Sequence, residues 1–313
     1  MEYRKLGNTD MLVSALSFGA SALGAVFGKT DDKEGIKTVH ASIDNGINYI
    51  DVAPFYGDTM AEKVLGEALK SVPRDKYFLA TKTGRFANGY FNFTPEAIEK
   101  SLHESLERLG VDYLDVLQLH DVEYQQKKHL NVVINESLPY LEELKSKGLI
   151  RYTGFTSYPI EVFQYVFENA GADTLLCHNH YMLSDTSMLQ LLPLAKNRGV
   201  GLIAASPLGM GLLTERGVAD WFPATEEDKR TVQKAATFCK ENGTSIEKLA
   251  LQFGCANPEI PTNLVSSSKP QRMINNIKVI EEPLDMELVY TVQQILAPIK
   301  DKDFDFANEC ELM

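Results

Sequence analysis

Four side chains suited to proton transfer stand at or just beyond the ends of apolar, β-prone runs. Asp51 ends one run and Tyr56 follows it, beyond a turn at Pro54, while Lys82 and His120 end two later runs. A buried carboxylate needs a cation or hydrogen-bond donors, so Asp51 predicts a lysine or arginine partner. A cation beside a phenol favours the ionised phenol, so Tyr56 and Lys82 together predict a proton donor and acceptor.

The elements that would position these side chains alternate between β-prone runs, loops and helical periods. About eight runs begin a strand-loop-helix unit, and eight is the number that closes a parallel barrel, with active sites at the carboxyl ends of the strands. The expected strands cover residues 16–19, 47–51, 78–82, 113–120, 150–156, 174–178, 200–205 and 263–266, and the expected helices cover residues 31–45, 94–109, 132–147, 160–169, 188–198, 226–242, 245–256, about 270–280 and 286–296.

The ends of the chain add to this pattern. Residues 4–14 contain a Gly-Asn-Thr-Asp turn between two short β-prone runs, which predicts an N-terminal β-hairpin. The alternative fold is a doubly wound sheet. The dinucleotide-binding motif typical of such sheets, Gly-x-Gly-x-x-Gly after a strand, is missing from the first unit. No linker composition marks a boundary. We therefore expect an α/β protein with one domain over residues 1–313, a (β/α)8 TIM barrel with an N-terminal β-hairpin and extra C-terminal helices.

Composition narrows the class of partner and the compartment. The chain has 313 residues, 44% hydrophobic content and a formal net charge of -12, and an acidic surface repels nucleic acid and anionic membranes. Its four cysteines stand far apart, as expected for reduced thiols. No run approaches the roughly 20 apolar residues of a membrane span, and the N-terminus does not resemble a signal peptide. We expect a soluble cytoplasmic protein.

The ordered set of Asp51, Tyr56, Lys82 and His120 at successive strand ends resembles the aldo-keto reductase superfamily. The resemblance extends from about Arg4 to about Ile280. Further motifs that carry it are Asp51-x-Ala53-x-x-Tyr56-Gly57, Ser105-Leu106-x-x-Leu109 followed by Asp112-Tyr113-x-Asp115, Gly148-Leu149-Ile150-Arg151-x-x-Gly154, and Ser206-Pro207-Leu208-Gly209-x-Gly211-Leu212-Leu213.

This resemblance implies an enzyme that transfers hydride between NAD(P) and a carbonyl or carbinol carbon, since no amino-acid side chain carries hydride. Tyr56 would be the acid in reduction and the base in oxidation. A free phenol of pKa about 10 is too weak an acid by about 3 units at neutral pH, or roughly 4 kcal/mol. Lys82 would favour the phenolate, Asp51 would hold Lys82, and His120 would orient the substrate oxygen or relay the proton.

The resemblance also assigns cofactor contacts. Thr156 and Ser157 stand where the family has a Ser-Asn pair that binds the nicotinamide carboxamide, and Tyr181 stands where a tyrosine stacks on the nicotinamide. Arg272 matches an arginine that NADP-preferring members use, but Ser266 replaces their preceding lysine, so NAD and NADP both stay open. The predicted cofactor residues are Thr156, Ser157, His178, Tyr181, Ser206, Pro207, Leu208, Gly211, Ser266, Ser268, Arg272, Asn275 and Asn276.

Two loops narrow the resemblance. Residues 18–28 and the pair His180-Tyr181 are similar to the group of plant L-galactose dehydrogenases and related aldose 1-dehydrogenases, which oxidise a sugar hemiacetal to a lactone. An NADPH-dependent reductase of small or lipophilic aldehydes and ketones is the alternative, and a cofactor-binding regulatory subunit with slow turnover is another. The reductase is supported by aromatic side chains that would line the substrate pocket, predicted as Phe27, Phe55, Phe86 and Trp221, with Tyr90 beside them.

The remaining predictions concern ligands and assembly. His178 and His180 could suggest a metal site, but strand residues two apart merely share a face, and no second ligand group has zinc spacing. No metal is therefore expected. We expect a small sugar or carbonyl substrate as the partner, and a monomer or weak homodimer.

Overall fold

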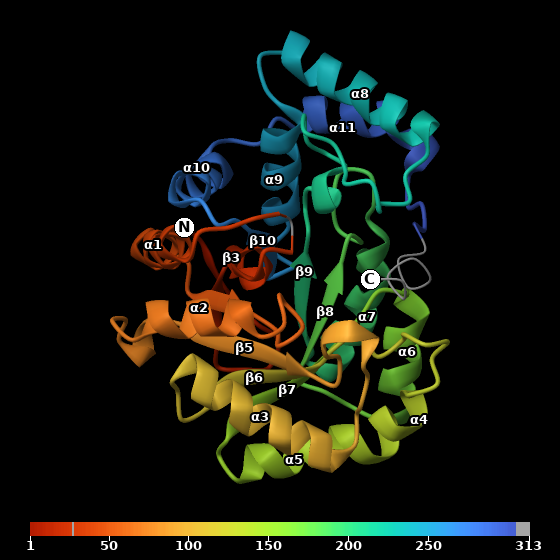
Figure 1. The fold of residues 1–313 in the computed structure, drawn as a ribbon. Coiled ribbons are helices and arrows are strands. Elements are labelled where there is room, and N and C mark those ends of the chain that lie inside the picture. Colours follow the sequence, from red (N-terminus) through yellow and green to blue (C-terminus); the bar gives the residue numbers. More distant parts are fainter. Residues whose placement is uncertain (27, 305–313) are drawn as a thin grey trace.

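The computed structural model describes residues 1–26 and 28–304. Within these residues eight parallel strands close into a barrel, with β3 paired to both β4 and β10 (Figure 1). This confirms the predicted (β/α)8 TIM barrel. The strands are β3 (Leu16–Gly19), β4 (Tyr49–Asp51), β5 (Phe78–Thr83), β6 (Leu114–Leu119), β7 (Ile150–Ser157), β8 (Thr174–His178), β9 (Gly201–Ala205) and β10 (Thr262–Ser266).

The predicted N-terminal hairpin is present and closes the amino-terminal end of the barrel. Its strands β1 (Tyr3–Lys5) and β2 (Leu12–Ser14) pair antiparallel, and Leu6, Met11 and Val13 pack with side chains from the barrel interior. Arg4 ties the hairpin to the far end of the sequence, since it donates to the carbonyl oxygens of Cys255 and Asn257 at 2.8 and 3.0 Å. The mouth at the other end is therefore the only end of the barrel left for a site in the part of the chain that is described.

Helices surround the barrel, and most of their bounds match the sequence patterns. Helix α2 is not among the predicted elements, because its start lacks a side-chain cap: Thr59 precedes it in a left-handed conformation, with φ of 72°. The helices of the ring are α1 (Asp32–Asp44), α2 (Met60–Leu69), α3 (Pro95–Leu109), α4 (Leu130–Val132), α5 (Leu138–Ser146), α6 (Ile160–Asn169), α7 (Leu192–Arg198), α9 (Ile246–Ala256) and α10 (Pro270–Glu281).

The helix expected over residues 132–147 is interrupted. A π-helical turn, Val133–Ser137, separates α4 from α5. Pro139 lacks the N–H that an α-helix would direct to the carbonyl of Asn135. The Ser137 hydroxyl donates to the Phe93 carbonyl at 2.6 Å, which anchors this turn to the loop after β5.

Two helices lie outside the ring, one between β9 and β10 and the other near the C-terminus, where extra helices are expected. Helices α8 (Glu226–Glu241) and α11 (Met286–Ile295) pack on each other at one end of the molecule, seen at the top of Figure 1. A capping box starts α8, in which Thr225 and Asp228 exchange hydrogen bonds. Asp228 also pairs with Lys302, which fastens the segment after α11 to the start of α8.

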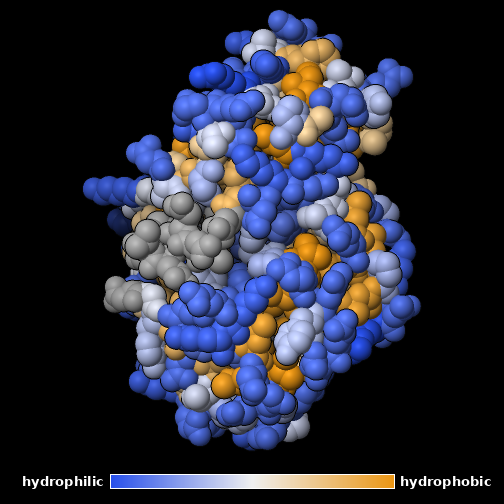
Figure 2. Space-filling view, turned by 90° about the vertical axis from the view of Figure 1, so that its right-hand side faces the viewer, coloured by the Kyte–Doolittle hydropathy of each residue, from blue (hydrophilic) through white to orange (hydrophobic). Residues whose placement is uncertain are grey.

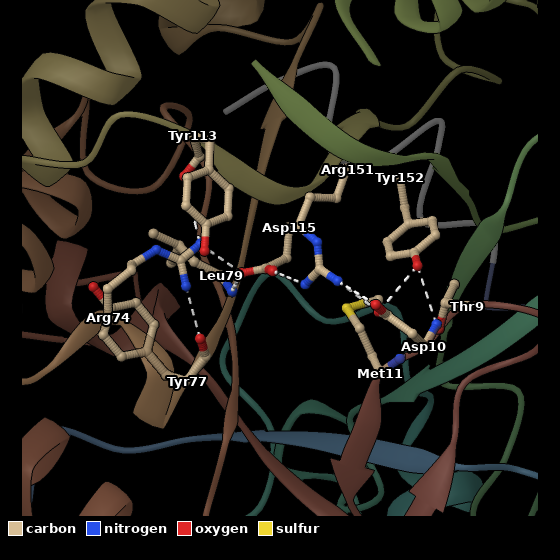
Figure 3. Close-up of polar contacts among 10 residues, drawn as sticks. All are labelled: Thr9, Asp10, Met11, Arg74, Tyr77, Leu79, Tyr113, Asp115, Arg151 and Tyr152. Carbon is tan, nitrogen blue, oxygen red and sulfur yellow. Dashed lines mark hydrogen bonds and ion pairs between the residues drawn. The ribbon is translucent and has the colours of Figure 1, made fainter. Parts of the chain in front are cut away.

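A chain of charged contacts joins the hairpin to the amino-terminal ends of β5, β6 and β7 (Figure 3). Asp115 is buried at its centre and accepts from Arg74 at 2.6 Å, from the Leu79 amide at 2.8 Å and from Arg151 at 2.7 Å. Arg151 reaches on to Asp10 at 2.6 and 2.7 Å. These partners satisfy a carboxylate that would otherwise destabilise the fold by its burial.

The surface carries polar side chains over much of the face seen in Figure 2, with hydrophobic residues in separate stretches. None of the described helices is long and apolar enough to cross a membrane. The large hydrophobic side chains that are exposed come from many elements: Tyr3, Leu12, Val26, Tyr90, Tyr165, Met286 and Tyr290.

Candidate active site

Asp51, Lys82 and Tyr56 meet at the carboxyl-terminal mouth of the barrel. Lys82 and Asp51 form a buried ion pair, and each is at most 2% exposed. The Lys82 ammonium also donates to the Tyr56 hydroxyl at 3.2 Å and to the Val52 carbonyl at 3.1 Å. Gln118 donates to the second carboxylate oxygen of Asp51 at 2.7 Å. Asp51 therefore holds the ammonium against the phenol, as the sequence predicts.

The turn after β4 fixes Tyr56. Its amide donates to the Ala53 carbonyl at 3.1 Å, which closes the turn around Pro54. Gly57 follows with φ of 63°, and a Cβ there would lie 2.2 Å from the Gly24 carbonyl oxygen. Only glycine fits that approach, so the loop after β3 packs directly against the turn that carries the phenol.

His120 follows β6 and completes the four-residue set. Its ring meets that of Tyr56 edge-on, with centroids 5.8 Å apart, and lies 5.9 Å from the ring of Phe55. The imidazole is 4% exposed, and its Nδ1 atom has no hydrogen-bond partner. A buried ring nitrogen without a protein partner beside the phenol is suited to meet a substrate oxygen.

Burial sets the protonation of these groups. Burial raises the pKa of Tyr56 above its usual 10 and outweighs the opposing effect of Lys82, so the phenol is neutral at pH 7. Lys82 favours the phenolate, as the sequence predicts, but its effect on the pKa of Tyr56 is smaller than that of burial. Burial alone lowers the pKa of Lys82, but Asp51 and Tyr56 raise it overall. Burial lowers the pKa of His120 to about 3, so the imidazole is neutral.

The four side chains line a cavity of about 480 Å³, within the range of small-ligand sites. Many predicted contact residues share it. Of these, the cavity is lined by Phe55, Thr156, His178, Ser206, Pro207, Leu208, Gly211, Ser266, Arg272 and Asn276.

Other predicted residues do not line this cavity in the described part of the chain. The ring of Tyr181 stacks on Phe253, with centroids 5.4 Å apart, and Phe86 packs on Tyr90 at 5.8 Å. Trp221 packs beside Phe222. Phe27 lies outside the described residues. The others away from the cavity wall are Ser157, which is fully buried, Ser268, and Asn275, which accepts a hydrogen bond from Gln271.

The Thr156 hydroxyl is hydrogen-bonded to Asp121. It accepts from the Asp121 amide and donates to the Asp121 carboxylate, both at 2.8 Å. A hydroxyl has one proton, so Thr156 offers none to a nicotinamide carboxamide in this arrangement.

Arg85 and Asp121, which are not among the residues predicted from the sequence, also line the cavity. They form a buried ion pair, and the guanidinium lies 3.9 Å from the centroid of the Phe55 ring and 4.3 Å from that of Tyr124. Burial alone would raise the pKa of Asp121, but His120 and Arg85 hold it well below its usual range. Their position gave a signal: Asp121 directly follows His120, and Arg85 stands three residues after Lys82.

The loop after β9 suits the phosphates of a dinucleotide. Ser206, Gly209, Met210 and Gly211 all have positive φ, from 54° to 109°. Successive amides in such conformations form concavities that bind anions. A Cβ on Gly211 would lie 2.7 Å from the Gly217 carbonyl oxygen, so the loop is folded as closely as glycine permits. Helix α10 starts beside the same cavity, and its N-terminal amides add to the positive potential.

No group of three His, Cys, Asp or Glu side chains among residues 1–26 and 28–304 could hold a metal ion.

The barrel, the buried Asp-Lys-Tyr set and a loop suited to phosphates are the features expected of an oxidoreductase that uses a nicotinamide cofactor. Residues 15–297 match the model of the Aldo/keto reductase family, and the chain belongs to that family. It is therefore an NAD(P)-dependent oxidoreductase that acts on CH–OH or C=O groups.

Individual relatives agree with this assignment. The chain is 43% identical over 310 residues to the L-galactose dehydrogenase of Arabidopsis thaliana, covering 96% of each chain. It is 31% identical to the D-arabinose 1-dehydrogenase of Saccharomyces cerevisiae, covering 77% of this chain and 75% of that one. Among solved structures, an aldo-keto reductase from Bacillus halodurans in its holo form superposes with a TM-score of 0.81 at 26% identity, covering 98% and 99% of the two chains.

Proposed function

We propose that the chain is an aldose 1-dehydrogenase that oxidises a sugar hemiacetal to a lactone, with L-galactose as the first candidate substrate. The observation that carries this proposal is the similarity, over nearly the full length of both chains, to the L-galactose dehydrogenase. A second relative whose name is that of an aldose 1-dehydrogenase supports it. The charged wall formed by Arg85 and Asp121 is consistent with a substrate rich in hydroxyl groups.

The proposed chemistry assigns one task to each side chain. A bound nicotinamide accepts the hydride in oxidation or supplies it in reduction. Tyr56, as phenolate, takes the proton from the anomeric hydroxyl, while the Lys82 ammonium stabilises the negative oxygen. Asp51 fixes Lys82, and the neutral His120 orients the substrate oxygen by a hydrogen bond. In reduction Tyr56 returns the proton to the carbonyl oxygen.

The proposed cofactor site follows the cavity wall from β9 to α10. Ser206, Leu208 and Gly211 would hold the pyrophosphate, while Arg272 and Asn276 would lie at the adenosine end. Lys269 is paired with Glu34, so part of the positive charge near Arg272 is already neutralised. The ratio of kcat/KM with NAD to that with NADP measures which cofactor this arrangement prefers.

A reductase of lipophilic aldehydes is the second candidate, because Phe55, Tyr124, Leu176 and Val265 add apolar surface to the cavity. The deciding experiment compares L-galactose with NAD against an aromatic aldehyde with NADPH, followed by the absorbance of reduced nicotinamide. A higher kcat/KM for the sugar supports the dehydrogenase, and the reverse order supports the reductase. Tight cofactor binding with no turnover of either substrate would instead indicate a regulatory subunit.

The proposal includes a cytoplasmic monomer or weak homodimer of one domain. The described cysteines Cys177, Cys239 and Cys255 are free and buried, which suits a reducing compartment. Large exposed hydrophobic side chains are dispersed over many elements, which favours a chain without an extensive obligate interface. Sedimentation at several concentrations would give the oligomeric state.

A further inference from the structure

The cavity contains a charged pair that the four-residue chemistry does not use. Arg85 and Asp121 are only 7% and 6% exposed, yet both line the cavity. Arg85 follows β5 and Asp121 follows β6, so two neighbouring strands deliver them to the same side of the mouth. The Nη1 atom of Arg85 donates to Oδ2 of Asp121. Burying two charges is unfavourable unless they are paired and further hydrogen-bonded, so this pair requires support from its surroundings.

Asp121 receives that support from Thr156. The Asp121 amide donates to the Thr156 hydroxyl, which in turn donates to Oδ1 of Asp121. Asp121 has φ of 51°, a left-handed conformation that costs a non-glycine residue about 1 kcal/mol. Two hydrogen bonds to one hydroxyl hold the residue in that conformation. The carboxylate is thus fixed before any substrate arrives.

Arg85 is fixed by aromatic rings. Its guanidinium carbon lies 3.9 Å from the Phe55 ring centroid and 4.3 Å from that of Tyr124. A guanidinium has five N–H groups, all in its own plane, and aromatic rings stack on its faces. Contacts of this kind restrict the side chain while leaving the donors directed along the plane. The pair therefore presents a rigid acceptor and rigid donors.

The pair lies close to the reacting atoms. Oδ2 of Asp121 is 3.5 Å from Nε2 of His120, whose ring lies edge-on to that of Tyr56. Phe55 touches both His120 and Arg85, so one ring bridges the two groups. Tyr56 and His120 are placed to contact the oxygen on the reacting carbon. The neighbouring carbon is one C–C bond away, so a hydroxyl on that carbon would lie near the same side chains.

We propose that Arg85 and Asp121 determine specificity by recognising the hydroxyl on the carbon next to the reacting carbon. A hydroxyl both donates and accepts, so it can donate to the Asp121 carboxylate while it accepts from the Arg85 guanidinium. A substrate without that hydroxyl removes water from the pair but forms no hydrogen bonds to replace those with water. Sites built to bind a hydroxyl reject the analogue that lacks it by up to about 10⁴-fold. This inference rests on the proposed function, since it names what selects a sugar over a lipophilic carbonyl compound.

The test measures discrimination rather than activity alone. For each enzyme, kcat/KM is determined for an aldose and for its 2-deoxy analogue with NAD, and for glyceraldehyde and 3-hydroxypropanal with NADPH. The wild type is expected to prefer the member of each pair that carries the 2-hydroxyl by about 100-fold or more. Asp121→Asn keeps the shape of the side chain and tolerates the left-handed backbone, and it is expected to reduce that preference at least about tenfold.

Two further variants test whether a loss of preference comes from an unpaired buried charge or from the removal of any carboxylate. Asp121→Asn leaves the Arg85 charge buried, so the double variant Asp121→Asn/Arg85→Met removes both charges and should show the same loss of preference. Glu161→Gln removes a carboxylate from an exposed ion pair with Lys127 and should leave the preference unchanged. Thermal unfolding establishes that each variant is folded.

The outcomes separate this inference from the proposed function. An unchanged preference in both Asp121→Asn and the double variant would overturn the role of the pair, whatever the best substrate is. No aldose oxidation by the wild type, together with a glyceraldehyde preference that Asp121→Asn abolishes, would overturn the aldose dehydrogenase and support the role of the pair. Loss of preference in both pairs of substrates supports both proposals.

Discussion

Two opposing effects act on the pKa of Tyr56, and their balance decides its protonation. Burial disfavours the phenolate, whereas the Lys82 ammonium 3.2 Å away favours it. Burial prevails, so Tyr56 is protonated at neutral pH, as its proposed role of proton donor in reduction requires. Reduction can use that form directly, while oxidation needs the minor, ionised form.

The pH dependence of the two directions should differ. Because burial raises the pKa of Tyr56, the ionised fraction grows about tenfold per pH unit below that pKa. We expect kcat/KM for sugar oxidation to rise with pH through the alkaline range, and kcat/KM for aldehyde reduction to stay flat near neutrality. Steady-state kinetics in both directions, in buffers of constant ionic strength, measures this. A plateau of the oxidation rate from pH 6 upward, or the same profile in Tyr56→Phe, would contradict it.

Removing the phenol hydroxyl should stop turnover without preventing cofactor binding. Tyr56→Phe keeps the ring and its edge-on contact with His120, so the site keeps its shape. General acid-base catalysis contributes about 10² to 10⁴-fold, and we expect kcat to fall by at least that much in both directions. Fluorescence titration should give a cofactor Kd close to that of the wild type. A variant that keeps more than about a tenth of the wild-type kcat would show that another group moves the proton.

The sequence predicts the positions of some side chains in the site well and those of others poorly. Asp51, Lys82 and His120 end successive parallel strands, and such ends meet at one rim, so their proximity follows from topology. The pairing of Arg85 with Asp121 depends on a left-handed backbone at Asp121, which no local pattern indicates. Tyr181 lies away from the cavity because its ring packs on Phe253 of α9, a contact between elements distant in sequence.

Among the elements, strands are predicted more closely than turns are. Buried parallel strands appear in the sequence as continuous apolar runs. The start of a helix can be predicted where a capping residue is present, such as Thr94 before α3. The π-helical turn at Val133–Ser137 was not predicted, because it depends on Pro139 acting on a carbonyl one turn earlier. The hairpin was predicted from its turn residues, but its position as the barrel's floor was not.

The hairpin depends on a glycine at its turn. Gly7 has φ of 56°, and a Cβ there would lie 2.4 Å from the Gly201 amide nitrogen. Gly7→Ala should therefore displace the hairpin and lower the free energy of unfolding by more than about 2 kcal/mol. Denaturant unfolding measures the change.

Gly148→Ala is the matched control for that substitution. Gly148 also has positive φ, 75°, but no atom lies within 4 Å of the position of its Cβ. It should lose only the conformational cost of about 1 kcal/mol. Equal losses in the two variants would show that the contact between the hairpin and β9 contributes nothing to stability.

The two ends of the barrel carry different groups of residues. The carboxyl-terminal mouth holds the proposed proton-transfer groups and the loop proposed to bind phosphate, while the opposite end is closed by the hairpin and by the contacts of Asp115 (Figure 3). We therefore expect that the contacts of Asp115 can be changed with little effect on catalysis. The two ends still share apolar side chains, since Leu176 and Leu264 belong to the cluster that holds the hairpin and also line the cavity.

Asp115→Ala tests that separation. It leaves two arginines without their shared carboxylate and should lower the free energy of unfolding by about 3 kcal/mol, since breaking a buried ion pair is strongly destabilising. At temperatures where the variant is folded, kcat/KM should stay within about twofold of the wild type. Glu67→Ala, which breaks an exposed pair with Lys70, should cost less than about 1 kcal/mol. A large loss of kcat/KM in folded Asp115→Ala would show that the two ends are coupled.

The hairpin also bears on how fast the chain folds. Arg4 and Cys255 are 251 positions apart, so the hydrogen bond between them closes a loop that spans most of the chain. Contacts between such distant positions raise the contact order and are slow to form, because the entropy of a long loop is lost before any contact compensates. The floor of the barrel can therefore be completed only after β9 and β10 have found their places, and until then its apolar side chains stay open to chaperones and proteases.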